Sequence, residues 1–162
     1  MISYLEGKII LKKDKFIVLD VNNVGYKVFL SRKAISNLPK IIINIPAIDI
    51  GPGLRVWCFH NVKEDISDLY GFLTYDELEF FEVLNDIRGV GPKAALEISS
   101  LGSLEKIKDR ILQQDEKIFA GISGIGAKKA STIILELTGK IKMLSSQKSK
   151  GTTDEAENAL VQ

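Results

Sequence analysis

The first 70 or so residues alternate between apolar and polar positions with the period of two that is typical of β-strands. Two such runs are separated by the turn-forming residues Asn22, Asn23 and Gly25. Their alternating positions are Lys15, Ile17, Leu19 and Val21 before the turn, and Tyr26, Val28 and Leu30 after it. A further run follows the breaker Gly51, Pro52, Gly53 and contains Leu54, Val56, Trp57, Phe59 and Val62. About five short antiparallel strands in this length indicate a small closed barrel.

The period becomes helical at Thr74, where apolar residues begin to recur every three or four positions. Thr74 and Glu77 have the spacing of a helix-capping box. The apolar stripe that follows consists of Phe80, Phe81, Leu84 and Ile87. We expect four more helices up to about Met143. Residues 145–153 are rich in lysine, serine, glycine and threonine, which predicts a flexible linker, and residues 154–161 begin an amphipathic helix.

These patterns predict an α+β protein with two domains and a tail. Residues 1–66 form a five-stranded β-barrel, for which the oligonucleotide-binding fold (OB-fold) is the commonest solution. Residues 67–144 form an all-α domain, and residues 145–162 are the linker and the start of a further helix. Trp57 and Phe59 are suited to stacking on bases, but packing in the core is the favoured interpretation.

Two glycine hairpins carry the candidate chemistry. Residues 88–93 include Gly89, Val90, Gly91 and Lys93, and residues 123–129 include Gly124, Ile125, Gly126, Lys128 and Lys129. Each follows an apolar helical segment and opens another, so each predicts a helix-hairpin-helix unit. Both glycines of a hairpin permit positive φ and the close approach of a foreign backbone. The first-turn amides of the second helix have no partner within the helix, and Pro92 fits such a first turn.

Unpaired amides beside lysines favour binding of a nucleic-acid phosphate without reading the base sequence. One such hairpin alone is usually a helix C-cap followed by a new helix start. Here, however, Gly89 and Gly124 are 35 positions apart, and a lysine follows the second glycine closely in both hairpins. We therefore interpret the pair as a duplicated DNA-binding module, a tandem helix-hairpin-helix domain.

Charge and composition narrow this interpretation. The 162 residues have a formal net charge of only +1, which argues against holding DNA by bulk electrostatics, so the binding surface must be local. The sequence lacks a membrane-length apolar run and a signal pattern, which makes the cytoplasm the expected location. Cys58 and His60 are the only cysteine and histidine, so we expect neither a disulfide nor a zinc site and no cofactor, and packing explains both residues.

Several motifs together resemble the RuvA family of bacterial Holliday-junction-binding proteins. They are the opening residues 1–8, the turn Val24, Gly25, Tyr26, the stretch from Lys63 to Phe72, and both hairpins. The resemblance covers residues 1 to about 144. It implies an OB-fold barrel, a tandem helix-hairpin-helix domain and a homotetramer, or two stacked tetramers, on four-way junction DNA. The implied protein partners are the RuvB ATPase, which is a separate chain, and the RuvC resolvase, and no catalytic residue is expected in this chain.

The family's acidic pin falls on Glu64 and Asp65, which alone would be interpreted as an ordinary solvated loop. Four copies would place carboxylates at the junction centre, where they repel phosphates. Two segments depart from the family pattern. The chain ends within what resembles the first helix of a third, RuvB-binding domain, so we expect coupling to the RuvB motor to be lost. The segment of residues 40–50 is longer and richer in isoleucine than the loop that the family usually has before the strand at Val56.

Two other functions compete with a DNA-binding scaffold. A helix-hairpin-helix repair enzyme of the glycosylase type requires a catalytic Asp shortly after the hairpin, but the first carboxylate after Lys129 is Glu136. A barrel and helical module could alternatively mediate only protein contacts. Binding to a four-way junction, compared with a linear duplex, discriminates among the three.

Overall fold

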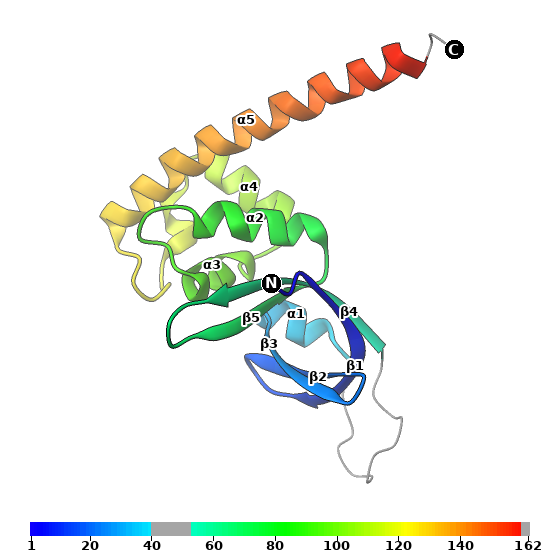
Figure 1. The fold of residues 1–162 in the computed structure, drawn as a ribbon. Helices are drawn as coiled ribbons and strands as arrows, with labels where there is room; N and C mark the ends of the chain where they lie inside the picture. The colour runs from blue at the N-terminus through cyan, green and yellow to red at the C-terminus, as the bar shows by residue number, and fades with distance from the viewer. Residues whose placement is uncertain (40–52, 160–162) are drawn as a thin grey trace.

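The structure, a computed structural model, describes residues 1–39 and 53–159, with side chains up to residue 143. Residues 40–50, where the sequence departs from the RuvA family pattern, lie outside the described residues. The chain builds a β-barrel first and a group of helices second, and the helices cover one side of the barrel (Figure 1).

Five strands close the barrel in the order β1-β2-β3-β5-β4. Their bounds are β1 (Tyr4–Lys12), β2 (Phe16–Val21), β3 (Val24–Phe29), β4 (Gly53–Val62) and β5 (Ser67–Phe72). The five-stranded barrel is as predicted. Its strands are not all antiparallel, however, because β3 pairs with β5 in parallel. A parallel neighbour requires a crossover, and the chain between β3 and β5, which includes β4, provides it.

The turn between β2 and β3 confirms the sequence prediction. Asn22 and Asn23 both adopt positive φ, at 52° and 66°, which is the backbone of a tight two-residue hairpin turn. The helix α1 (Arg32–Asn37) that follows β3 was not predicted. Ser31 caps it by accepting a hydrogen bond from the Ala34 amide, and Ala34 and Ile35 are buried.

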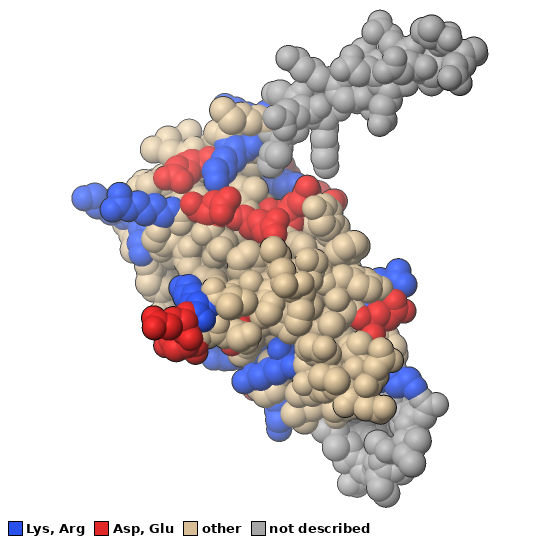
Figure 2. Space-filling view, in the orientation of Figure 1, with Lys and Arg blue, Asp and Glu red and all other residues tan. Residues whose placement is uncertain are grey.

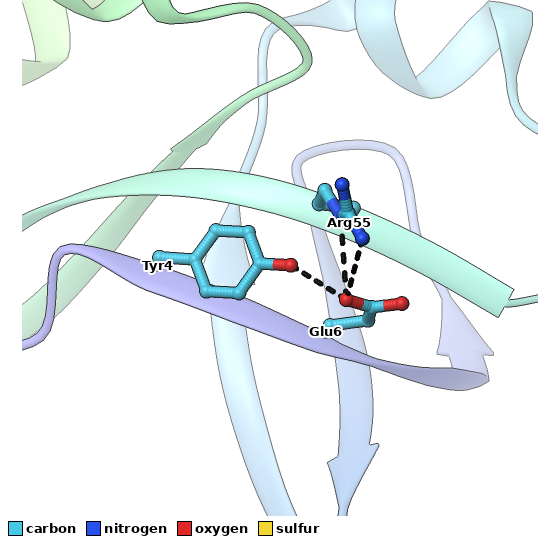
Figure 3. A network of polar contacts seen from close by, with 3 residues as sticks. All are labelled: Tyr4, Glu6 and Arg55. Carbon is cyan, nitrogen blue, oxygen red and sulfur yellow. Dashed lines mark hydrogen bonds and ion pairs between the residues drawn. The ribbon is translucent and has the colours of Figure 1, made fainter.

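The barrel interior is filled by the alternating apolar side chains. Ile17, Leu19, Val28 and Val56 are fully buried. On the outer face, Glu6 of β1 lies opposite Arg55 of β4 and accepts hydrogen bonds from it and from the Tyr4 hydroxyl, at 2.6 Å (Figure 3). The Tyr4 hydrogen bond, and then the Arg55 guanidinium, lower the pKa of the Glu6 carboxyl.

The helical part begins at the predicted cap. Thr74 accepts a hydrogen bond from the Glu77 amide at 3.3 Å, while the Glu77 carboxylate accepts one from the Leu73 amide. The elements are α2 (Tyr75–Asn85), α3 (Pro92–Ser99), α4 (Leu104–Leu112), the short 3-10 helix η1 (Glu116–Phe119) and α5 (Ala127–Ala159). The second helix-hairpin-helix unit therefore enters its hairpin from a single 3-10 turn.

The helices pack on the barrel through a hydrophobic cluster that is separate from the one filling the barrel interior. The Phe81 ring of α2 contacts the rings of Phe59, Tyr70 and Phe72 in β4 and β5, with centroid separations of 5.2, 5.8 and 4.8 Å. Trp57 and Phe59 pack against the same cluster, which confirms their predicted role in packing. The Lys33 ammonium of α1 also donates a 2.7 Å hydrogen bond to the Gly102 carbonyl between α3 and α4. These contacts fix the hairpins relative to the barrel.

The tail differs from the prediction, because α5 continues as a helix to Ala159 through the segment expected to be a flexible linker. Lysine, glutamine, glutamate and alanine are good helix formers, and Gly151 alone costs only about 1 kcal/mol. Extension of an existing helix also avoids the cost of nucleation. Within the described residues, none of the helices is both long and apolar enough to span a membrane.

Candidate nucleic-acid interface

The two hairpins have the same backbone geometry. The first glycine of each adopts positive φ, +85° at Gly89 and +82° at Gly124. The next amide closes the turn in both: the amide of Val90 donates to the Ile87 carbonyl at 2.9 Å, and that of Ile125 to the Ile122 carbonyl at 3.2 Å. The predicted duplication is therefore present in the backbone as well as in the sequence.

The second glycine of each hairpin is different. Gly91 has an extended backbone, with φ −94° and ψ 173°, and Gly126 also lacks a positive φ. Only the first glycine of each hairpin therefore uses the positive φ that glycine permits. No described atom lies within 4 Å of where a Cβ on Gly91 or Gly126 would be. Neither backbone strain nor packing explains these glycines, but the close approach of a ligand backbone would.

The central residues of the hairpins anchor them to the core. Val90 is buried, and Ile125 is half-buried and packs against the same hydrophobic cluster. Both side chains therefore hold their hairpins against the helical part of the molecule.

The helices that follow the hairpins, α3 and α5, differ from α2 and α4 in the residues of their first turns. The first turns of α2 and α4 carry acidic residues, and their N-caps Thr74 and Ser103 accept hydrogen bonds from first-turn amides. In contrast, the N-cap of α3 is Gly91, which has no side chain to accept such a bond. The first turns of α3 and α5 contain lysines and no acidic residue. Positive charge at a helix N-terminus is unfavourable for the helix itself by about 0.3–1 kcal/mol. An anionic ligand would reverse the sign of that effect.

The lysines of these turns lie in two environments. Lys93 of α3 and Lys128 of α5 are exposed. Lys129 is half-buried, and its ammonium donates a 2.9 Å hydrogen bond to the Gly124 carbonyl. The structure thus distinguishes two lysines that the sequence pattern treats alike.

Both hairpins face one groove of about 540 Å³. The hairpins contribute Gly89, Gly91, Lys93, Ser123, Gly124 and Lys129, and the opposite wall is the β4–β5 strand pair, with Asn61, Lys63, Asp68 and Tyr70. Figure 1 shows the hairpins and the β4–β5 tip on the same edge of the molecule. The sequence analysis did not identify the strand wall, because its residues approach the hairpins only after the barrel and the helices pack together.

Glu64 and Asp65 lie in the turn that joins β4 to β5, which confirms the predicted loop. Backbone hydrogen bonds between Lys63 and Ile66, at 2.8 and 3.4 Å, hold the turn, and both carboxylates are exposed. Since Lys63 and Ile66 line the groove, the acidic tip projects beside it. In Figure 2, acidic atoms gather at this tip on the left of the molecule, with lysine and arginine atoms near the start of α5 above them.

Cys58 and His60 have structural roles. Cys58 is buried, and burial raises the pKa of its thiol to about 11. His60 Nδ1 accepts a hydrogen bond from the Ile2 amide, so the neutral ring carries its proton on Nε2, which lies 3.0 Å from the Ser67 hydroxyl. Within the described residues, no group of three or more His, Cys, Asp or Glu side chains is placed to hold a metal ion.

Known proteins match this chain over both parts. The model of a family described as the RuvA N terminal domain matches residues 1–71, and one described as a SAM-like helix-hairpin-helix tandem matches residues 81–138. A Holliday junction branch migration complex subunit RuvA from Clostridium acetobutylicum is 40% identical over 154 residues, which are 95% of this chain and 71% of that protein.

Proteins of the same name from Clostridium perfringens and Acetivibrio thermocellus are 39% and 38% identical over 142 residues, which are 88% of this chain and 66% of each relative. The chain thus spans about two thirds of the length of these curated relatives. None of these matches supports the glycosylase alternative.

Proposed function

Because this chain belongs to the RuvA family, we propose that it binds four-way (Holliday) junction DNA as the scaffold subunit of a branch-migration complex in homologous recombination and DNA repair. The observation that carries the proposal is the pair of equivalent hairpins that face one groove beside an acidic turn.

The hairpins hold the DNA by its phosphates. The unpaired first-turn amides of α3 and α5 bind phosphate oxygens, and the bare Cα atoms of Gly91 and Gly126 let the DNA backbone approach them. Lys93, Lys128 and Lys129 add positive charge at the same place. Contacts of this kind position the DNA without reading its sequence, which suits a protein that must let the junction move.

The acidic turn selects the shape of the DNA. Glu64 and Asp65 beside the groove repel phosphates, so they disfavour a continuous duplex across this surface. In a homotetramer, four such turns would meet at the junction centre and keep the arms apart.

The proposed assembly has further parts. We place the chain in a homotetramer, or in two stacked tetramers, in the cytoplasm. It is a non-catalytic subunit of a complex whose ATPase, of the RuvB type, is a separate chain, with a RuvC-type resolvase as a further partner. We assign residues 1–66 to the barrel that forms the tetramer core and residues 67–144 to the DNA-binding domain.

Electrophoretic mobility shift tests the function directly. We expect the chain to bind a four-way junction at lower protein concentration than a linear duplex of equal length. Lys93→Met should weaken binding, because Lys93 is an exposed lysine that lines the groove, and Lys13→Met should not, because Lys13 is an exposed lysine in the turn between β1 and β2, outside the groove. Equal affinity for junction and duplex would refute the proposed function, and absence of DNA binding would favour a module that mediates only protein contacts.

A further inference from the structure

The side chain of Lys129 touches the first glycine of both hairpins. Its ammonium donates a 2.9 Å hydrogen bond to the carbonyl of Gly124 in the second hairpin. Its Cδ, Cε and Nζ atoms lie 3.8, 3.2 and 3.5 Å from the position that a Cβ on Gly89 would occupy in the first hairpin. The stem of Lys129 therefore lies across the bare Cα of Gly89, and its charged end is bound to Gly124.

These two contacts bridge segments that are far apart in sequence. Gly89 and Gly124 are the positions at which each hairpin adopts positive φ, so Lys129 joins the equivalent points of the duplicated unit. A hydrogen bond from a charged donor is stronger than one from a neutral donor. The bridge lies in the wall of the groove, which both glycines and Lys129 line.

We infer that Lys129 is a positioning residue, which holds the two hairpins at a fixed separation so that their amide clusters engage two phosphates of the DNA together. The inference rests on the proposed function, and it gives Lys129 a different role from that of Lys128. Lys128 is exposed and free to approach a phosphate, whereas the ammonium of Lys129 is already engaged with a carbonyl. Sites that are positioned before binding lose less conformational freedom when the ligand binds, so the affinity rises without a new contact.

The first experiment is a double-mutant cycle on four-way junction binding. Lys129→Met keeps the stem over Gly89 and removes the ammonium, and Gly91→Val disables the first hairpin. Alone, Lys129→Met should weaken binding several-fold, while Lys129→Arg, which retains a charged donor, should stay close to the unaltered chain.

In the Gly91→Val background, Lys129→Met should have no further effect, because only one hairpin remains to be positioned. Lys128→Met is the matched control, and its full effect should persist in that background. If Lys129→Met and Gly91→Val are additive, Lys129 acts within its own hairpin and the inference is wrong.

The second experiment needs no DNA. Hydrogen exchange is measured at the Val90 and Ile125 amides, which close the two hairpin turns. Lys129→Met should speed exchange several-fold at both amides, and Lys128→Met should leave both unchanged. Faster exchange at Ile125 alone would overturn the bridge. Since this readout is independent of DNA, it also separates failure of the inference from failure of the proposed function, which would instead appear as equal binding of junction and duplex by the unaltered chain.

Discussion

At the scale of single residues, the two glycines of each hairpin meet different requirements. Gly89 and Gly124 adopt the left-handed conformation that a side chain with a Cβ resists, so the fold needs glycine there. Gly91 and Gly126 have an ordinary backbone and open space around the Cβ position. A substitution at the second glycine therefore tests DNA binding with little effect on folding. A substitution at the first glycine would also destabilise the fold, so its effect on DNA binding could not be separated.

We predict that Gly91→Val and Gly126→Val each weaken junction binding by about tenfold or more, because the added side chain keeps the phosphate from the amides behind it. Fluorescence anisotropy titrations with labelled junction at several salt concentrations measure the effect. The free energy of unfolding should fall by at most the ~1 kcal/mol that a poorer N-cap costs.

Lys93→Met and Lys128→Met are the comparison for these variants. Each should weaken all DNA similarly and lower the slope of log affinity against log salt by about 0.9, the value for one phosphate contact. The valine variants should be the more damaging, because they obstruct the amides and not just a charge. Valine variants that bind junction like the unaltered chain would show that the hairpins are not the phosphate sites.

At the scale of elements, the sequence predicts best what short-range patterns determine. The turn at Asn22 and Asn23 and the cap at Thr74 were predictable because each depends on neighbours within about four residues. The helix α1 was missed because six residues are too few to show a period. The parallel pairing of β3 with β5 and the strand wall at Lys63 depend on segments brought together by the whole fold, so no local pattern reports them.

The β4–β5 hairpin presents its acidic tip as a discrete element, and its function can be tested without disturbing its shape. Backbone hydrogen bonds between Lys63 and Ile66 hold the turn, so Glu64→Gln together with Asp65→Asn should preserve it. We predict that this variant binds linear duplex more tightly and prefers the four-way junction less, because the carboxylates that repel a continuous duplex are gone.

Competition between labelled junction and unlabelled duplex measures the preference of the acidic-tip variant. Asp14→Asn is the control, because Asp14 is an exposed carboxylate in the turn between β1 and β2, outside the groove. If the double variant still prefers the four-way junction to the same extent, Glu64 and Asp65 belong to an ordinary solvated loop.

At the scale of the whole molecule, the groove exists only because two separately patterned parts pack against each other through one hydrophobic cluster. One wall belongs to the barrel and the other to the helical hairpins, and the packing of Phe81 against Phe59, Tyr70 and Phe72 holds the walls together. The two parts should therefore unfold as a single cooperative unit, although the sequence presents them as consecutive domains.

Phe81 provides the test of this coupling. We predict that Phe81→Ala lowers the free energy of unfolding by about 3–5 kcal/mol, because its ring is fully buried and the cavity would open between barrel and helices. Phe81→Leu, which fills more of the space, should cost less. Urea unfolding can be followed by the methyl NMR signals of Val28 and Val56, which lie inside the barrel, and by far-UV circular dichroism, which reports mainly the helices. If the two parts unfold as one unit, both signals change together in the unaltered chain, and Phe81→Ala shifts both midpoints alike. If the helical signal alone moves, the barrel is stable without its helical neighbour, and the groove depends on docking of two independent domains.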